Sequence, residues 1–184
     1  MLKDKVDILR FMKDNPGSKY GDIVNNFLDH GKDFAENLSS YMVELKKEKL
    51  LDIKCFGNFE VFHNGEILPF KRKKTKELLA VLIDRNGAGM TAKQICAVLF
   101  PDDIDDVKNA AYLRQLVMDL KNTLKSIGAE SVLCHETPCY RIDTSLIKCD
   151  YISYLETGKP EFYGEYMTQY SWAEETCAML RFKK

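Results

Sequence analysis

Residues 107–127, VKNAAYLRQLVMDLKNTLKSI, constrain this chain most, because their apolar side chains recur with the period of an α-helix. The apolar face consists of Leu113, Leu116, Val117, Leu120, Leu124 and Ile127. The opposite face carries Lys108, Ala111, Gln115, Met118, Asp119, Asn122 and Lys125, flanked by Tyr112 and Arg114. Amide, guanidinium and ammonium groups are those with which a helix reads base edges and holds phosphates. The alternative interpretation is an ordinary solvated helix face.

The elements around this helix follow a definite order. Residues 52–70 alternate apolar and polar side chains around Asn64-Gly65, which predicts a small antiparallel sheet with a hairpin turn. Helical patterning returns at Thr75 and again after Thr91, which suits a helix N-cap. After Gly128, VLC, HETP and CYRI have the pattern of a strand, a turn and a strand. Sheet, two helices, long helix and hairpin together predict an α+β winged helix-turn-helix, with residues 107–127 as its recognition helix.

The remaining parts of the chain are predicted to be helical. Residues 1–50 contain three short helical patterns, two of them separated by Pro16-Gly17. They form either a small bundle that packs on a neighbour or partner chain, or a second helix-turn-helix without a wing. We therefore divide the chain into a helical N-terminal unit (1–50), a winged-helix domain (51–146) and a short helical segment (147–184).

Composition narrows the class of protein. The 184 residues carry a net charge of −1, which disfavours tight non-specific binding to nucleic acid unless the basic groups share a face. There is no apolar run long enough for a membrane span and no signal-peptide core at the N-terminus, so we expect a cytoplasmic protein. The six cysteines lack C-x-x-C spacing and are expected to be reduced thiols.

The sequence offers no clear catalytic or metal site. Cys134, His135 and Cys139 have no obvious fourth ligand, and the two cysteines fall on opposite arms of the predicted hairpin. There is no glycine-rich phosphate loop, no H-E-x-x-H motif and no serine nucleophile elbow. We therefore expect neither an enzyme nor a cofactor.

Five segments, taken in order, carry a family resemblance: CFGNFEVFHNGE, FKRKKTKELLAVLIDRNGAGMT, ICAVLFPDD, YLRQLVMDLKNTL and CYRID. Together they resemble the OmpR/PhoB-type winged-helix DNA-binding domain, and more closely its version in the SARP and SARP-like regulators of Gram-positive bacteria. YISYLETG and YGEYMTQYSWAEE look like the start of the bacterial transcriptional activator domain that follows in that family. The resemblance covers about residues 52–178 and implies a truncated activator domain, because the chain stops at Lys184. Asp119 stands where related sequences often carry a basic residue.

The aromatic segment YGEYMTQYSWAEE has two interpretations. It is either a helix that packs against the winged helix, which we favour, or an exposed aromatic patch for self-association or contact with RNA polymerase.

The function implied is a sequence-specific DNA-binding transcriptional regulator that acts as a homodimer, with double-stranded DNA as its partner and RNA polymerase as a candidate second one. The helix would enter the major groove while the wing and the basic segment hold phosphates. The candidate DNA-binding residues are Lys71, Arg72, Lys73, Lys74, Lys76, Lys108, Tyr112, Arg114, Gln115, Met118, Asp119, Lys121, Asn122 and Arg141. The alternative is a winged-helix protein–protein interaction module that has lost DNA binding.

Overall fold

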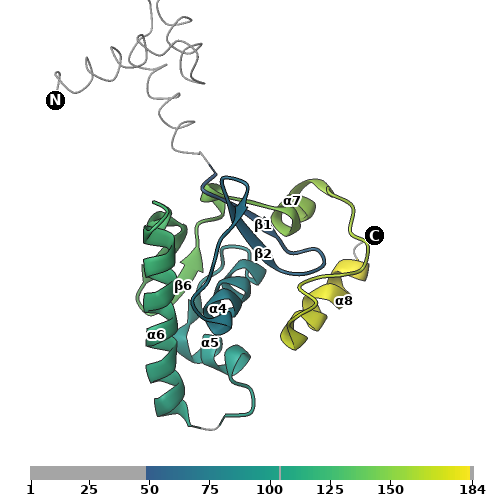
Figure 1. The fold of residues 1–184 in the computed structure, drawn as a ribbon. Coiled ribbons are helices and arrows are strands. Elements are labelled where there is room, and N and C mark those ends of the chain that lie inside the picture. Colours follow the sequence, from purple (N-terminus) through teal and green to yellow (C-terminus); the bar gives the residue numbers. More distant parts are fainter. Residues whose placement is uncertain (1–48, 104, 183–184) are drawn as a thin grey trace, which may run out of the picture. The chain divides into compact units, whose positions relative to one another are not determined.

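The computed structural model describes residues 49–103 and 105–182. The chain divides into two units, residues 1–47 and 48–184, and the described residues belong to the second. The helical unit predicted for residues 1–50 lies outside the described residues, apart from Lys49 and Leu50. Figure 1 shows the second unit with one long helix along a side, two helices beside it and a small sheet at one end. Among the described helices, none combines the length and the apolar character that a bilayer span requires.

The first sheet joins strands from the two ends of this unit. Its strands are β1 (Leu51–Lys54), β2 (Glu60–His63), β3 (Glu66–Ile67) and β7 (Ile147–Cys149), in the order β3-β2-β1-β7. The first three pair antiparallel, as the alternating pattern predicts. Asn64 and Gly65 take φ values of 51° and 83° in the β2–β3 turn, the positive-φ geometry that Asn-Gly favours. β7 adds to β1 in parallel, and the sequence pattern did not predict this strand.

Three helices form the centre of the unit: α4 (Lys73–Asp84), α5 (Ala92–Leu99) and α6 (Asp106–Lys125). Residues 78–83 of α4 are each at most 2% exposed, so this part of the helix lies in the core. α5 begins with a capping box, in which Thr91 Oγ1 accepts from the Gln94 amide (3.3 Å) and Gln94 Oε1 accepts from the Thr91 amide (2.8 Å). The predicted N-cap at Thr91 is therefore confirmed.

α6 turns its predicted apolar face to the core. Leu113, Leu116, Val117, Leu120 and Leu124 are buried, and Ile127 is half-buried just beyond the helix end. At the N-terminus, Asp105 Oδ1 accepts a hydrogen bond from the Lys108 amide at 2.9 Å. Asp106 lies in the first turn and Lys125 in the last, which complements the helix dipole at both ends. The long helix is thus fixed by its inner face and by its ends.

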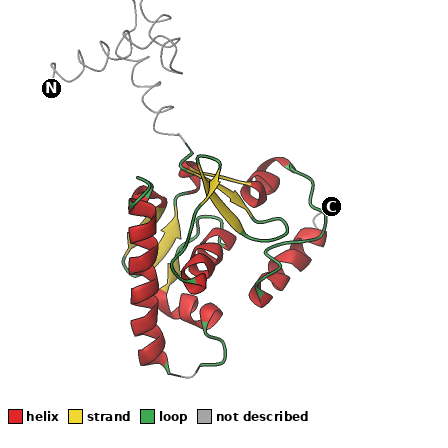
Figure 2. Ribbon diagram, viewed as in Figure 1, coloured by secondary structure: helices red, strands yellow, loops and turns green. Residues whose placement is uncertain are grey.

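The second sheet contains the predicted wing. Its strands are β4 (Met90–Thr91), β5 (Leu133–Glu136) and β6 (Cys139–Ile142), antiparallel in the order β4-β6-β5. β5 and β6 are the predicted hairpin, while the two-residue β4 connects it to the start of α5. Figure 2 shows this sheet beside α6 and apart from the first sheet. With α4, α5 and α6, it gives the described residues the predicted α+β winged-helix fold.

The chain after β7 folds back onto the first sheet. α7 (Asp150–Thr157) and α8 (Glu174–Phe182) are joined by an extended segment that runs along the β1–β2 connection. The Met167 amide donates to the Cys55 carbonyl (2.8 Å), and the Gly57 amide donates to the Glu165 carbonyl (3.0 Å). The segment YGEYMTQYSWAEE therefore packs through these backbone hydrogen bonds and through buried side chains such as Tyr166 and Met167, which are 2% and 0% exposed. The helix predicted there begins only at Glu174. Tyr163 is the exception, since it is 86% exposed.

Candidate nucleic-acid interface

One row of side chains on α6 faces solvent. It consists of Ala111, Gln115, Met118 and Asn122, all exposed, with Met118 65% exposed. The spacing of four, three and four residues places them in line on one helix face. The inner face of α6 is buried in the core, and this packing fixes the position of the exposed row. Two amides thus alternate with two apolar groups on a rigid support.

One flank of α6 contacts the start of α4. Arg72, which immediately precedes α4, forms an ion pair with Asp119. The Asp119 side chain is only 17% exposed and that of Arg72 36%. Two turns before Asp119, Tyr112 packs on Phe100 with ring centroids 5.6 Å apart. The sequence predicted three separate DNA contacts here. In the structure Arg72 and Asp119 bind each other, and Tyr112 packs on the C-terminal end of α5.

The other flank of α6 carries Arg114 and Lys121, both exposed and without an ion-pair partner among the residues described. Ala110, one turn before Arg114, lines an open groove with Lys93 and Cys96 of α5. The first turn of α5 therefore lies on the same side as Arg114.

Lys93 is a candidate that was not predicted from the sequence. It is exposed in the first turn of α5, and the described residues offer it no ion-pair partner. A helix N-terminus with a lysine is a favourable place for a phosphate. The signal was present in the sequence, because the T-x-x-Q capping box locates the start of the helix and hence of its first turn.

The basic segment 71–76 is partly neutralised by nearby carboxylates. The ion pairs are Lys74–Glu77 at 2.9 Å, Lys76–Glu60 at 2.6 Å and, at the start of α6, Lys108–Asp103 at 3.6 Å. Lys71 and Lys73 remain exposed and have no such partner in the part of the chain that the structure describes. The segment therefore offers fewer unpaired cations than its composition suggests.

In the wing, Arg141 is also paired. Its Nη2 lies 2.7 Å from Glu136 Oε1, and this hydrogen bond raises the pKa of the Arg141 guanidinium. On the other face of the hairpin, the His135 and Tyr140 rings stack with centroids 4.3 Å apart. The predicted wing cation is thus present, but a phosphate would have to compete with Glu136 for it.

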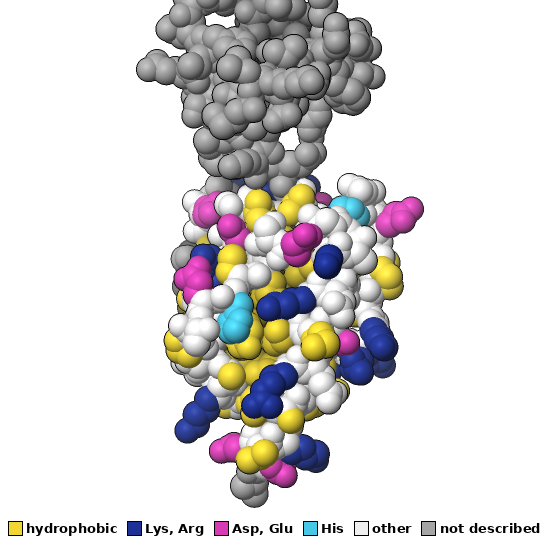
Figure 3. Space-filling model, turned by 90° about the vertical axis from the view of Figure 1, so that its left-hand side faces the viewer, with side chains coloured by type: hydrophobic (Ala, Val, Ile, Leu, Met, Phe, Trp, Pro, Cys, Tyr) yellow, Lys and Arg dark blue, Asp and Glu magenta, His cyan; other side chains and the backbone are white. Residues whose placement is uncertain are grey.

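Figure 3 shows the side of the molecule on which α6 lies. Hydrophobic side chains gather in the middle of this face, and Lys and Arg side chains are spread over and around them. The positive charges do not form one continuous patch. This distribution agrees with the near-neutral net charge and with the internal ion pairs described above.

No family model matches the sequence, and no curated protein matches it. Among solved structures, the chain is similar to EmbR of Mycobacterium tuberculosis, determined in complex with a low affinity phosphopeptide. The TM-score is 0.61 at 18% sequence identity, over 74% of this chain and 43% of the EmbR chain. The chain thus spans less than half of that protein. The likeness supports the winged-helix fold that the sequence motifs predict.

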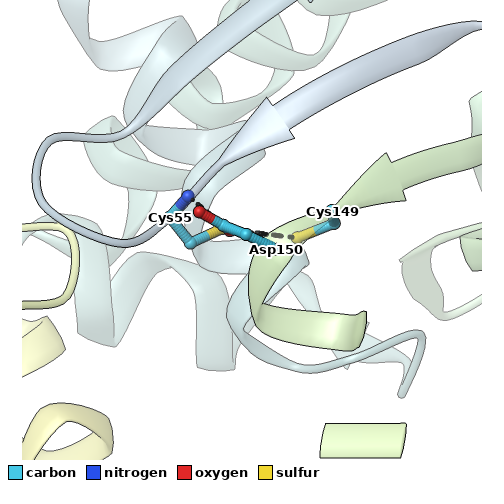
Figure 4. Close-up of side chains that lie close together, drawn as sticks. All are labelled: Cys55, Cys149 and Asp150. Carbon is cyan, nitrogen blue, oxygen red and sulfur yellow. Dashed lines mark hydrogen bonds between the residues drawn. The ribbon is translucent and has the colours of Figure 1, made fainter. Parts of the chain in front are cut away.

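Away from α6, one group of potential metal ligands was not foreseen. Cys55, Cys149 and Asp150 lie together where β1 and β7 end, with ligand atoms within 4.8 Å of one another and the two sulfurs 3.5 Å apart (Figure 4). Asp150 Oδ1 accepts from the amides of Cys55 (2.8 Å) and Tyr151 (2.7 Å), and Oδ2 from that of Phe56 (3.0 Å). Burial raises the pKa of the Cys55 thiol well above its usual range, which favours a protonated thiol. The cluster therefore serves to hold the ends of the two strands together.

Proposed function

We propose that this chain is a sequence-specific DNA-binding transcriptional regulator, with α6 in the major groove. The observation that carries the proposal is the exposed row of α6 in a winged-helix fold. A rigid helix that presents amides outward, beside a two-stranded wing, has the shape and the chemistry of a major-groove reader.

The flanks of α6 supply the phosphate contacts in this proposal. Arg114, Lys121 and Lys93 lie on one side of the exposed row, and Lys71 and Lys73 precede and begin the helix that contacts the other side. Phosphate contacts on both sides of an inserted helix set its position, and base contacts set its specificity. The regulator acts as a homodimer on two half-sites in the cytoplasm, and RNA polymerase is a further partner.

A second candidate function is a protein–protein interaction module. It is favoured by the neutralisation of Arg72, Lys74, Lys76, Lys108 and Arg141 by carboxylates, and by the apolar middle of the face in Figure 3. EmbR, the structural neighbour, was solved with a peptide bound. In this alternative, the winged helix is a scaffold and DNA is not a ligand.

The salt dependence of DNA binding separates the two functions. Anisotropy of a labelled random duplex is measured with the full chain across salt concentrations, for the wild type and for Arg114→Ala/Lys121→Ala. For a regulator, log K falls linearly with log salt, and the slope decreases by about 0.9 for each phosphate that the variant no longer neutralises. Lys148→Ala is the matched control, because Lys148 lies on β7 and pairs with Asp52. A folded wild-type protein that shows no salt-dependent binding would favour the interaction module.

A further inference from the structure

We propose that α6 reads A·T base pairs, with Gln115 and Asn122 bound to adenines and Met118 packed on a thymine methyl group between them. This inference rests on the proposed DNA binding and adds the identity of the bases that are read. It follows from which side chains of α6 are exposed and which are buried or held in ion pairs.

The chemistry of the exposed row matches one kind of base pair. In the major groove, Asn and Gln pair in bidentate fashion with adenine N6 and N7, Arg and Lys pair with guanine, and carboxylates accept from cytosine N4. An apolar side chain recognises the thymine methyl group. Lys108 and Lys125 lie at the two ends of this face, where Lys108 is paired with Asp103 and Lys125 is in the last turn of α6. Between them, the row Ala111, Gln115, Met118 and Asn122 contains only amides and apolar groups. Adenine and thymine are therefore the bases that it fits.

The structure removes the one acidic reader that the sequence offered. Asp119 would be suited to cytosine N4, but its carboxylate is paired with Arg72 and mostly buried against the start of α4. To reach a base it would have to leave the guanidinium with which it is paired. Its role is thus to hold the start of α4, with Lys71 and Lys73, against the side of α6.

Two further cations that could read guanine, Arg114 and Lys121, stand to the side of the row. Ala110, one turn before Arg114, lines a groove with Lys93 in the first turn of α5. A group of cations beside an inserted helix, next to a second helix N-terminus, is placed for the phosphate backbone. These side chains therefore position the helix and do not read guanine.

The spacing along the row suits adjacent base pairs. Gln115 and Met118 are separated by about 4.5 Å along the helix axis, and Gln115 and Asn122 by about 10.5 Å, at 1.5 Å per residue. Base pairs rise by about 3.4 Å, so the two amides are about three base-pair steps apart. Met118 falls between them, about one step from Gln115. The bases read by one helix thus form an A·T-rich core of about four pairs.

The first test is selection of duplexes from a random library by the full chain at near-physiological salt, followed by affinity measurements on the selected duplex. We expect an A·T core. Replacement of its thymines by uracil, which removes only the methyl groups, should weaken wild-type binding about fourfold for the methyl that Met118 covers. Met118→Ala should bind the two duplexes equally. Gln115→Ala or Asn122→Ala should each relax selection at one A·T position by about fivefold or more.

Lys125→Ala is the matched control, since Lys125 is an exposed residue in the last turn of α6 and should not change base preference. A core of G·C pairs, or an A·T core at which Met118→Ala leaves the effect of uracil unchanged, would overturn this inference while leaving DNA binding intact. Absence of any salt-dependent DNA binding would instead remove the proposed function and the inference with it.

Discussion

The hydroxyl of Tyr166 donates a hydrogen bond to Oδ1 of Asp84 over 2.8 Å. This bond ties the segment between α7 and α8 to the last residue of α4. Burial raises the pKa of Asp84, although the hydrogen bonds from Tyr166 and Thr176 lower it. Burial also raises the pKa of Tyr166, which is therefore a neutral donor. The C-terminal segment is thus attached to the helical core through the Asp84 carboxylate, which accepts hydrogen bonds from the hydroxyls of Tyr166 and Thr176.

Tyr166→Phe should destabilise the protein by about 1–3 kcal/mol, because it removes a donor from a largely buried carboxylate while keeping the ring in place. The measurement is urea unfolding followed by circular dichroism. Tyr163→Phe is the matched control, since Tyr163 is exposed and donates its hydroxyl hydrogen bond to Glu161, which is also exposed. Equal midpoints for the two variants would show that the Tyr166–Asp84 bond does not stabilise the fold.

Asp84→Asn should change the pH dependence of stability. The folded pKa of Asp84 is raised, so the folded state holds the proton more tightly than the unfolded chain, and stability falls as pH rises through the folded pKa. Asn keeps an oxygen that accepts from Tyr166 and does not titrate. Thermal unfolding from pH 4 to 7 should therefore show the variant gaining stability relative to the wild type as pH rises.

Asp143→Asn gives the opposite sign and serves as the control. Hydrogen bonds from Ser145 lower the pKa of Asp143, so its stabilisation is present above the unfolded pKa and is lost as pH falls through the folded pKa. The Asn variant should thus lose stability relative to the wild type as pH rises toward the ordinary aspartate pKa of 3.8, so the scan for this variant begins at about pH 2. The same sign for both variants would contradict the assignment of the two environments.

Much of the winged helix could be predicted from local patterns. Three features depend only on residues that are close together in the sequence, and each is confirmed: the apolar stripe of α6, the capping box at Thr91 and the turn at Asn64-Gly65. β4 and β7 could not be predicted in this way. They are two and three residues long, and their pairing partners β6 and β1 are distant in sequence.

The candidate interface was predictable in outline and not in its pairings. Helical periodicity indicates which α6 residues face outward, and the exposed row agrees with it. Arg72 and Asp119 are far apart in sequence, and only the packing of α4 against α6 brings them together. Likewise, Cys55 and Asp150 meet because β7 adds to β1.

The two faces of α6 should respond differently to truncation. Leu120→Ala removes a fully buried side chain and should cost about 2–5 kcal/mol of unfolding free energy. Met118→Ala, two residues away on the exposed row, should change stability by less than about 0.5 kcal/mol. Chemical denaturation of both variants measures the difference. A large loss of stability in Met118→Ala would mean that this row is covered in the free protein.

Asp150→Asn should destabilise the junction of β1 and β7. The carboxylate accepts from three backbone amides, and an Asn side chain must turn its NH2 toward at least one of them. A buried amide left without an acceptor costs about 1–3 kcal/mol. The control is Asp52→Asn, which breaks only the exposed pair with Lys148 and should cost less than about 1 kcal/mol. Denaturant midpoints for the two variants provide the comparison.

Lys93→Ala tests whether the first turn of α5 holds a phosphate in the proposed complex. Removal of this ammonium group should weaken binding to all duplexes alike and reduce the slope of log K against log salt by about 0.9. Folding should be unaffected, because Lys93 is exposed and the capping box at Thr91 and Gln94 remains. Salt titrations on two duplexes of different sequence distinguish the outcomes. Weaker binding to one sequence alone would make Lys93 a base reader, and an unchanged slope would place the DNA backbone away from α5.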